Sequence, residues 1–198
     1  MITKKITPAD AADWQLKELY QTAFPVEEQI PWNDLMRLVD EMHLDFTAYY
    51  EKTELREHSQ ACLDPAVSHR ESTEGQGERF IGFTIVYPRP VFNWFWYFAV
   101  RPELRGMGKG QEILTALVEK YKGQSCVLDM ESPRQVCENM ELRKRRHDFY
   151  LRNGFRDTNV YRYFDDIEMT IMMMGEGTFT IQNWDEIVSE LRQFWTWD

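Results

Sequence analysis

Three glycines stand within five residues in the stretch RGMGKG, which begins at Arg105. An apolar and aromatic run, FNWFWYFAV, comes before this stretch, and a helical pattern comes after it. The first turn of a helix carries N–H groups without intrahelical partners and a partial positive charge, which together favour a bound phosphate. Glycine also permits a close backbone approach and a positive φ. The stretch therefore predicts an anion site between a strand and a helix, with a plain connection as the alternative interpretation.

Two other phosphate-binding loops do not fit these residues. A Walker loop needs a lysine followed by serine or threonine, whereas Lys109 is followed by Gly110. The dinucleotide fingerprint GxGxxG needs a wider spacing of its last two glycines and a place early in a βαβ unit. Here the spacing is GxGxG, after a region that predicts antiparallel strands.

Hydrophobic periodicity predicts one main sheet flanked by helices, a mixed α/β (α+β) domain. We expect the first helix to begin with Thr7 as its cap, and the last helix to be capped by Asn183 with Glu186 three residues later. The predicted strands cover residues 4–7, 45–51, 79–90, 92–100, 125–130, 159–164 and 168–174. The predicted helices cover residues 7–24, a segment from about 31, 113–121, 138–155 and 183–195.

Composition bounds the domain organisation and the class of partner. The 198 residues and the hydrophobic fraction of 43% suit a single domain over residues 1–198, with the polar, aperiodic segment 52–78 as a flexible insertion. A net charge of -10 disfavours nucleic acid and anionic membranes. No apolar run approaches the ~20 residues that span a bilayer, and the N-terminus does not read as a signal peptide.

The cysteines point to a reducing compartment. There are three of them, none in a CxxC pair, which argues against disulfides and structural zinc. We therefore expect free thiols, no bound metal and a cytoplasmic location. Exposed strand edges are compatible with a homodimer.

The glycine stretch carries a family resemblance. The spacing Arg105-x-x-Gly108-x-Gly110, after a strand and before a helix, resembles the acetyl-CoA signature Gln/Arg-x-x-Gly-x-Gly/Ala of the GNAT superfamily of N-acetyltransferases. The element order is also similar to that of the family over nearly the whole chain. The resemblance implies the acyl-CoA N-acyltransferase fold, with a mostly antiparallel central sheet.

Residues downstream extend the resemblance. FYLRNGF, from Phe149 to Phe155, is similar to the aromatic-Tyr-x-x-x-Gly-Phe motif of the family. ESP, which begins at Glu131, and RRxxFY, which begins at Arg145, resemble features of a bacterial branch.

The resemblance implies a site for acetyl-CoA as co-substrate. The strands that end at Val100 and near Glu131 would separate, and the pantetheine arm would pair with the backbone near Phe98 and Val100. The pyrophosphate would bind the backbone amides of Arg105, Gly106, Met107, Gly108, Lys109 and Gly110.

The resemblance also implies roles in the chemistry. Tyr150 would protonate the leaving thiolate, because a phenol with a pKa of about 10 can donate to the anion of a thiol whose pKa is ~8.5. A backbone N–H near Val100 would stabilise the developing charge on the carbonyl oxygen. Asp129 and Glu131 lie two apart on a strand, on one side of it, and Glu131 is nearer the cleft end. We expect Glu131 to be the base and to contact the substrate.

The predicted function is direct transfer of an acetyl group from acetyl-CoA to an amine of a small molecule or peptide. Glu28, between the first two helices, is expected to attract a cationic amine. In many relatives the base lies on the strand before the glycine turn, and here that strand has no carboxylate. A non-catalytic CoA-binding module of the same fold is therefore the alternative function, and transfer of a longer acyl group is a third one.

Overall fold

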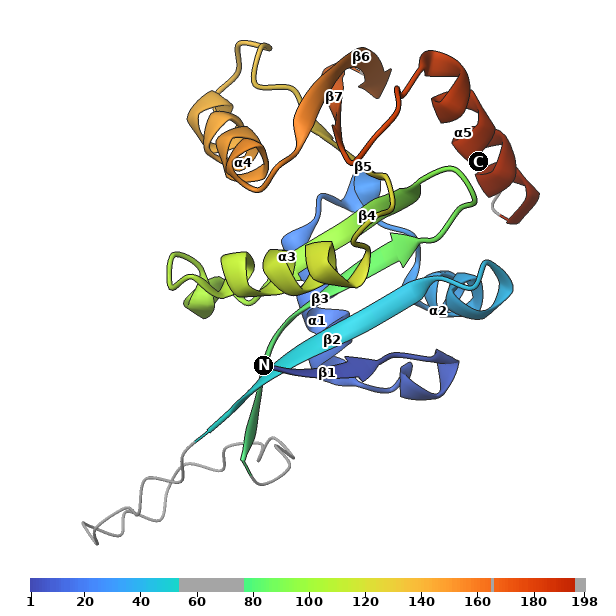
Figure 1. Ribbon diagram of the computed structural model, residues 1–198. Helices are drawn as coiled ribbons and strands as arrows, with labels where there is room; N and C mark the ends of the chain where they lie inside the picture. The colour runs from blue at the N-terminus through green and yellow to red at the C-terminus, as the bar shows by residue number, and fades with distance from the viewer. Residues whose placement is uncertain (54–76, 165, 195–198) are drawn as a thin grey trace, which may run out of the picture.

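The computed structural model describes residues 1–53, 77–164 and 166–194 (Figure 1). Seven strands in this part of the chain form one sheet: β1 (Ile2–Lys5), β2 (Asp45–Lys52), β3 (Glu78–Tyr87), β4 (Asn93–Val100), β5 (Cys126–Glu131), β6 (Arg156–Phe164) and β7 (Ile167–Met174). Their order across the sheet is β1-β2-β3-β4-β5-β7-β6. All neighbours run antiparallel except β4 and β5, which are parallel. The predicted mixed fold and its order of elements are confirmed.

Helices cover both faces of the sheet. They are α1 (Trp14–Ala23), α2 (Trp32–Glu41), α3 (Lys109–Lys120), α4 (Met140–Arg152) and α5 (Ile181–Phe194), with short 3-10 turns η1 (Pro8–Asp10), η2 (Val26–Glu28) and η3 (Pro102–Leu104). The buried side chains of α1, α2 and α5 join one apolar cluster with the sheet, and those of α3 join another, against which α4 packs. The two clusters therefore mark the two faces. None of the helices in the described residues is long and apolar enough to cross a membrane.

Two predicted helix starts differ from the structure. Thr7 forms a capping box with Asp10, but the turn that it begins is only η1. The α-helix begins later, where the Asp13 carboxylate accepts hydrogen bonds from the first-turn amides of α1. At α5, Asn183 lies inside the helix, and its side chain accepts hydrogen bonds from the N–H and hydroxyl of Thr180. The predicted cap of α5 therefore lies three residues too late, because both positions carry residues suited to a cap.

The predicted insertion at residues 52–78 falls mostly outside the described residues, which end at 53 and resume at 77. The hairpin that follows is confirmed, since β3 and β4 pair antiparallel. Their register shifts between Ile85 and Val86, so that Trp96 of β4 forms a bulge.

Gly82 lies where β3 approaches β4 too closely for a side chain. It pairs with Val100, and a Cβ atom at Gly82 would collide with the carbonyl oxygen of Ala99. The obstacle is backbone, so it cannot swing aside as a flexible side chain would. This glycine keeps β4 in register up to the end that leads into the glycine turn.

We predict that Gly82→Ala lowers the free energy of unfolding by at least about 2 kcal/mol, because the added methyl group must push β4 away. Urea unfolding followed by circular dichroism measures this change. Gly110→Ala in α3 is the matched control, since a Cβ at Gly110 would lie at an ordinary contact distance of 3.7 Å from Val100 Cγ2. That variant should match the wild type or gain up to about 1 kcal/mol of helix propensity. Equal stability of the two variants would contradict the prediction.

Candidate active site

A gap opens between β4 and β5 in the middle of the sheet. The two strands pair at only two register positions, Asn93 with Cys126 and Trp94 with Val127. Past these positions, no pairing joins the rest of β4 to the rest of β5. In Figure 1, β6 and β7 accordingly stand apart from the part of the sheet formed by β1 to β4. The separation expected between the ends of these strands is present.

The backbone at the end of β4 turns polar groups toward this gap. The Arg101 N–H donates to Ile81 O of β3 at 2.9 Å, so the backbone N–H of Arg101 faces β3. Polar groups alternate between the two sides of a strand, which directs the N–H of Val100 to the gap. The Val100 carbonyl is free of β3 as well, because it accepts from Arg105 Nε at 3.1 Å. An extended ligand arm could pair with this edge.

The glycine turn leads into the N-terminus of α3. Gly106 and Gly108 have φ of 77° and 81°, a region that favours glycine, and neither has any atom within 4 Å of the place where a Cβ would stand. The first hydrogen bond of α3 runs from the Glu112 N–H to the Gly108 carbonyl at 3.1 Å. The amides just before Glu112 therefore lack intrahelical partners. Open backbone amides at a helix N-terminus are the arrangement that binds a phosphate.

The basic side chains of the turn are already paired. Arg105 is bound to the Val100 carbonyl, and Lys109 Nζ lies 2.8 Å from Glu51 and 3.0 Å from Glu112. These carboxylates raise the pKa of Lys109, Glu51 more than Glu112. Met107 is 62% exposed. The attraction of this turn for an anion therefore comes chiefly from the amides and the helix dipole.

Tyr150 lies on α4 and is half-buried. Its ring packs against Phe149 and Phe155, at centroid distances of 5.4 and 5.5 Å. Burial raises its pKa to about 12, while the charge of Arg146 opposes the rise. Its hydroxyl makes no hydrogen bond within the described residues. The phenol is therefore a protonated donor that is available to a ligand.

Glu131, the predicted base, is held by two arginines of α4. Its carboxylate lies 2.8 Å from Arg143 Nη2 and 3.7 Å from Arg146 Nη1. Arg143 has only 6% of its side chain exposed and also donates to Gln135 at 3.1 Å. Both contacts engage the carboxylate, and the pair with Arg143 fastens β5 to α4. Sequence reasoning missed Arg143, although it lies seven residues before Tyr150 and so on the same helical face.

Asp129 lies two residues earlier on β5, on the face of the sheet covered by α1, α2 and α5. Its register partner on β7, Ile171, belongs to the apolar cluster of that face. Its Oδ1 accepts a hydrogen bond from Trp94 Nε1 at 2.8 Å. Burial raises the pKa of Asp129, and the hydrogen bond from Trp94 opposes that rise. Asp129 therefore has the environment of a proton acceptor.

Glu28 lies in η2, near the same face. The Tyr97 hydroxyl donates to the Glu28 carbonyl at 2.7 Å. Burial is the main cause of the raised pKa of Tyr97, and the charges of Glu28 and Asp129 both add to it. Two carboxylates, one on η2 and one on β5, therefore act on a single phenol of β4.

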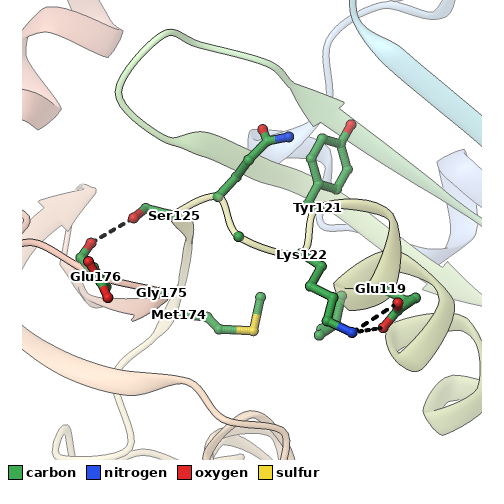
Figure 2. A pocket seen from close by; sticks show the side chains of 10 residues that line it. Glu119, Tyr121, Lys122, Ser125, Met174, Gly175 and Glu176 are labelled. Atoms are coloured by element: carbon green, nitrogen blue, oxygen red, sulfur yellow. Dashed lines mark hydrogen bonds and ion pairs between the residues drawn. The ribbon is translucent and has the colours of Figure 1, made fainter.

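A cavity of about 330 Å³ lies elsewhere, between the end of α3 and the end of β7 (Figure 2). In Figure 2, Lys122 points to Glu119, and the Ser125 hydroxyl meets the backbone carbonyl of Glu176. This cavity adjoins the first residue of β5, whereas Glu131 ends that strand. None of the predicted site residues lines it.

Residues 71–157 match the model of the family described as "Acetyltransferase (GNAT) domain". This match covers the glycine turn, the β4–β5 gap and Tyr150. No curated protein matches the chain.

Solved structures share the fold over most of the chain. An acetyltransferase-family (GNAT) protein from Bacteroides thetaiotaomicron is 23% identical, with a TM-score of 0.67 over 98% of this chain and 97% of that one. The ribosomal-protein-S18-alanine N-acetyltransferase from Escherichia coli is 14% identical, with a TM-score of 0.55 over 90% and 99%. An aminoglycoside 6'-N-acetyltransferase in complex with coenzyme A is 14% identical, with a TM-score of 0.57 over 87% and 96%.

At such identities the likeness to these structures concerns the fold. The family match concerns residues 71–157, so this part of the chain is similar to a GNAT acetyltransferase domain, and the whole chain has the fold of GNAT acetyltransferases.

Proposed function

We propose that the protein transfers an acetyl group from acetyl-CoA directly to an amine, within a ternary complex. The observation that carries this proposal is the β4–β5 gap, which has open helix amides at one end and a carboxylate and a phenol beside it. The names of two structural neighbours support an amine acceptor, since both are N-acetyltransferases. Their acceptors differ, so the identity of the amine is a separate matter.

The residues present fit acetyl-CoA. Gly106 and Gly108 leave open space above the turn, where a Cβ would otherwise approach the ligand. The amides of Arg105 to Gly110 would hold the pyrophosphate, and the free edge of β4 at Phe98 and Val100 would pair with the pantetheine arm. When bound, acetyl-CoA supplies the activated acetyl thioester.

Acceptor binding is assigned to the face of α1 and α2. Glu28 and Asp129 give this face negative charge, which would attract a protonated amine. The amine must then lose a proton before it attacks. We assign this proton to Asp129 rather than to Glu131, because the Glu131 carboxylate is engaged by Arg143 and Arg146.

The leaving sulfur needs a proton, and Tyr150 is placed to give it. Its pKa of about 12 keeps the hydroxyl protonated at neutral pH, and it packs on the other face of the sheet, in the cluster beside α3. The Val100 N–H would stabilise negative charge on the carbonyl oxygen. The new C–N bond forms as the C–S bond breaks. Of the two protons that the ammonium group loses, the first goes to Asp129 and the second to water, while Tyr150 gives its proton to the sulfur; exchange with water then restores both side chains.

A covalent acyl-enzyme on cysteine finds no support in the described residues. Cys126 lies at the paired end of β5, and burial raises the pKa of its thiol to about 11. Such a thiol is a poor nucleophile at neutral pH. Cys137 lies in the loop between β5 and α4 and donates to the Asn139 side chain at 3.0 Å. Direct transfer needs neither thiol.

We predict that the protein binds acetyl-CoA and that Gly108→Glu weakens binding by about 100-fold or more, because the new carboxylate repels the pyrophosphate and strains the turn. Isothermal titration calorimetry measures both affinities. Gly123→Glu is the matched control, since Gly123 follows the other end of α3 with φ of 79° and equally open surroundings. It should bind like the wild type. Absence of binding to the folded wild type would refute the proposed donor.

We predict that Asp129→Asn and Tyr150→Phe each lower turnover by about 100-fold or more, whereas Glu131→Gln keeps at least about a tenth of it. Release of free CoA, measured over a panel of primary amines, reports turnover. A larger loss in Glu131→Gln than in Asp129→Asn would return the role of base to Glu131. Tight acetyl-CoA binding without acetylation of any amine would instead favour the non-catalytic CoA-binding module.

A further inference from the structure

Trp94 lies at the last position where β4 pairs with β5. Only 4% of its surface is exposed, and a buried indole N–H needs an acceptor. The acceptor is Asp129 Oδ1 on the neighbouring strand, at 2.8 Å. The contact therefore joins the two strands by their side chains just where their backbones part.

Other rings fix the orientation of this indole. Trp96 stacks on Trp94 with a centroid distance of 4.7 Å and an interplanar angle of 18°. Trp184 of α5 meets Trp94 edge-on at 6.0 Å and 76°. Contact on two sides prevents the Trp94 ring from turning its N–H away from Asp129.

We propose that Trp94 is the positioning residue of Asp129, holding one carboxylate oxygen by hydrogen bond so that the other is presented to the incoming amine. This inference rests on the proposed function. Within the described residues, Oδ2 has no hydrogen bond to another residue.

The hydrogen bond also favours the ionised form of the carboxylate. Burial raises the pKa of Asp129, and the Trp94 N–H lowers it again by stabilising the charged form. Within the described part of the chain, the charge of Asp129 acts on Tyr97 of β4 and Tyr150 of α4, and burial raises the pKa of both phenols. Across the strand pair, β7 offers the apolar Ile171. Trp94 is thus the main group that offsets desolvation, and the backbone N–H of Asp129 itself adds to its effect.

The first test compares Trp94→Phe with Trp96→Phe, which keeps an aromatic ring to stack on Trp94 and removes no hydrogen bond to Asp129. Without the indole N–H, Asp129 takes up a proton at higher pH, so the acidic limb of the kcat/KM profile should move to higher pH. On that limb kcat/KM should fall about tenfold, while at the high-pH plateau it should stay within about twofold. Trp96→Phe should leave the position of the limb unchanged. An unmoved limb in a folded Trp94→Phe variant would overturn the proposal.

A second test needs no acceptor and no turnover. In protein labelled with ¹⁵N at tryptophan, the indole N–H resonance of Trp94, assigned from Trp94→Phe, should shift with pH as Asp129 ionises. The shift should disappear in Asp129→Asn. A Trp94 resonance that does not respond to pH in the wild type would overturn the proposal, whatever the kinetics show. If instead the resonance titrates but no amine is acetylated, the proposed function fails and the contact between Trp94 and Asp129 stands.

Discussion

The parting of β4 from β5 is the constraint on which the site depends. Two paired positions hold β4 and β5 together. Beyond them each strand keeps its neighbour on the outer side but has no strand paired to it on the side of the gap, in the middle of a seven-stranded sheet. Unpaired backbone groups are costly when water is excluded, so such an edge is stable where something else pairs with it. Arg105 satisfies the Val100 carbonyl, while the Val100 N–H is left to a ligand. Arg105, the arginine of the glycine signature, thus also has a structural role, because it satisfies the carbonyl at the end of β4.

In the proposed reaction, electrostatics divide the site into an end for the donor and an end for the acceptor. The chain has a net charge of -10, yet the proposed donor, acetyl-CoA, is an anion. Lys109 cannot resolve this conflict alone, because Glu51 and Glu112 compete for its charge. Backbone amides can, since they bind phosphate without a net charge of their own and act only at short range. The acidic surface then remains free to favour a cationic amine on the side of Glu28.

Sequence reasoning located the elements and the glycine turn because both follow from local patterns: periodicity, glycine spacing and the aromatic motif around Tyr150. It was less able to rank Asp129 against Glu131. Both lie on one strand two residues apart, and their difference depends on partners distant in the chain, Trp94 for one and Arg143 for the other. A buried tryptophan on a strand does signal the need for an acceptor, but no sequence pattern says which carboxylate supplies it.

The proposed acid and base lie on opposite faces of the sheet, which gives the reaction a direction. Asp129 shares its face with α1, α2 and α5, and Tyr150 packs in the cluster beside α3. An amine that approaches from the first face can give up its proton there, while the sulfur on the second face receives one. Burial raises the pKa of both groups. The phenol stays protonated at neutral pH although it becomes a weaker acid, and the carboxylate becomes a stronger proton acceptor as long as it is ionised. That condition ties the proposed chemistry to the hydrogen bonds that favour the ionised carboxylate, chiefly the one from Trp94.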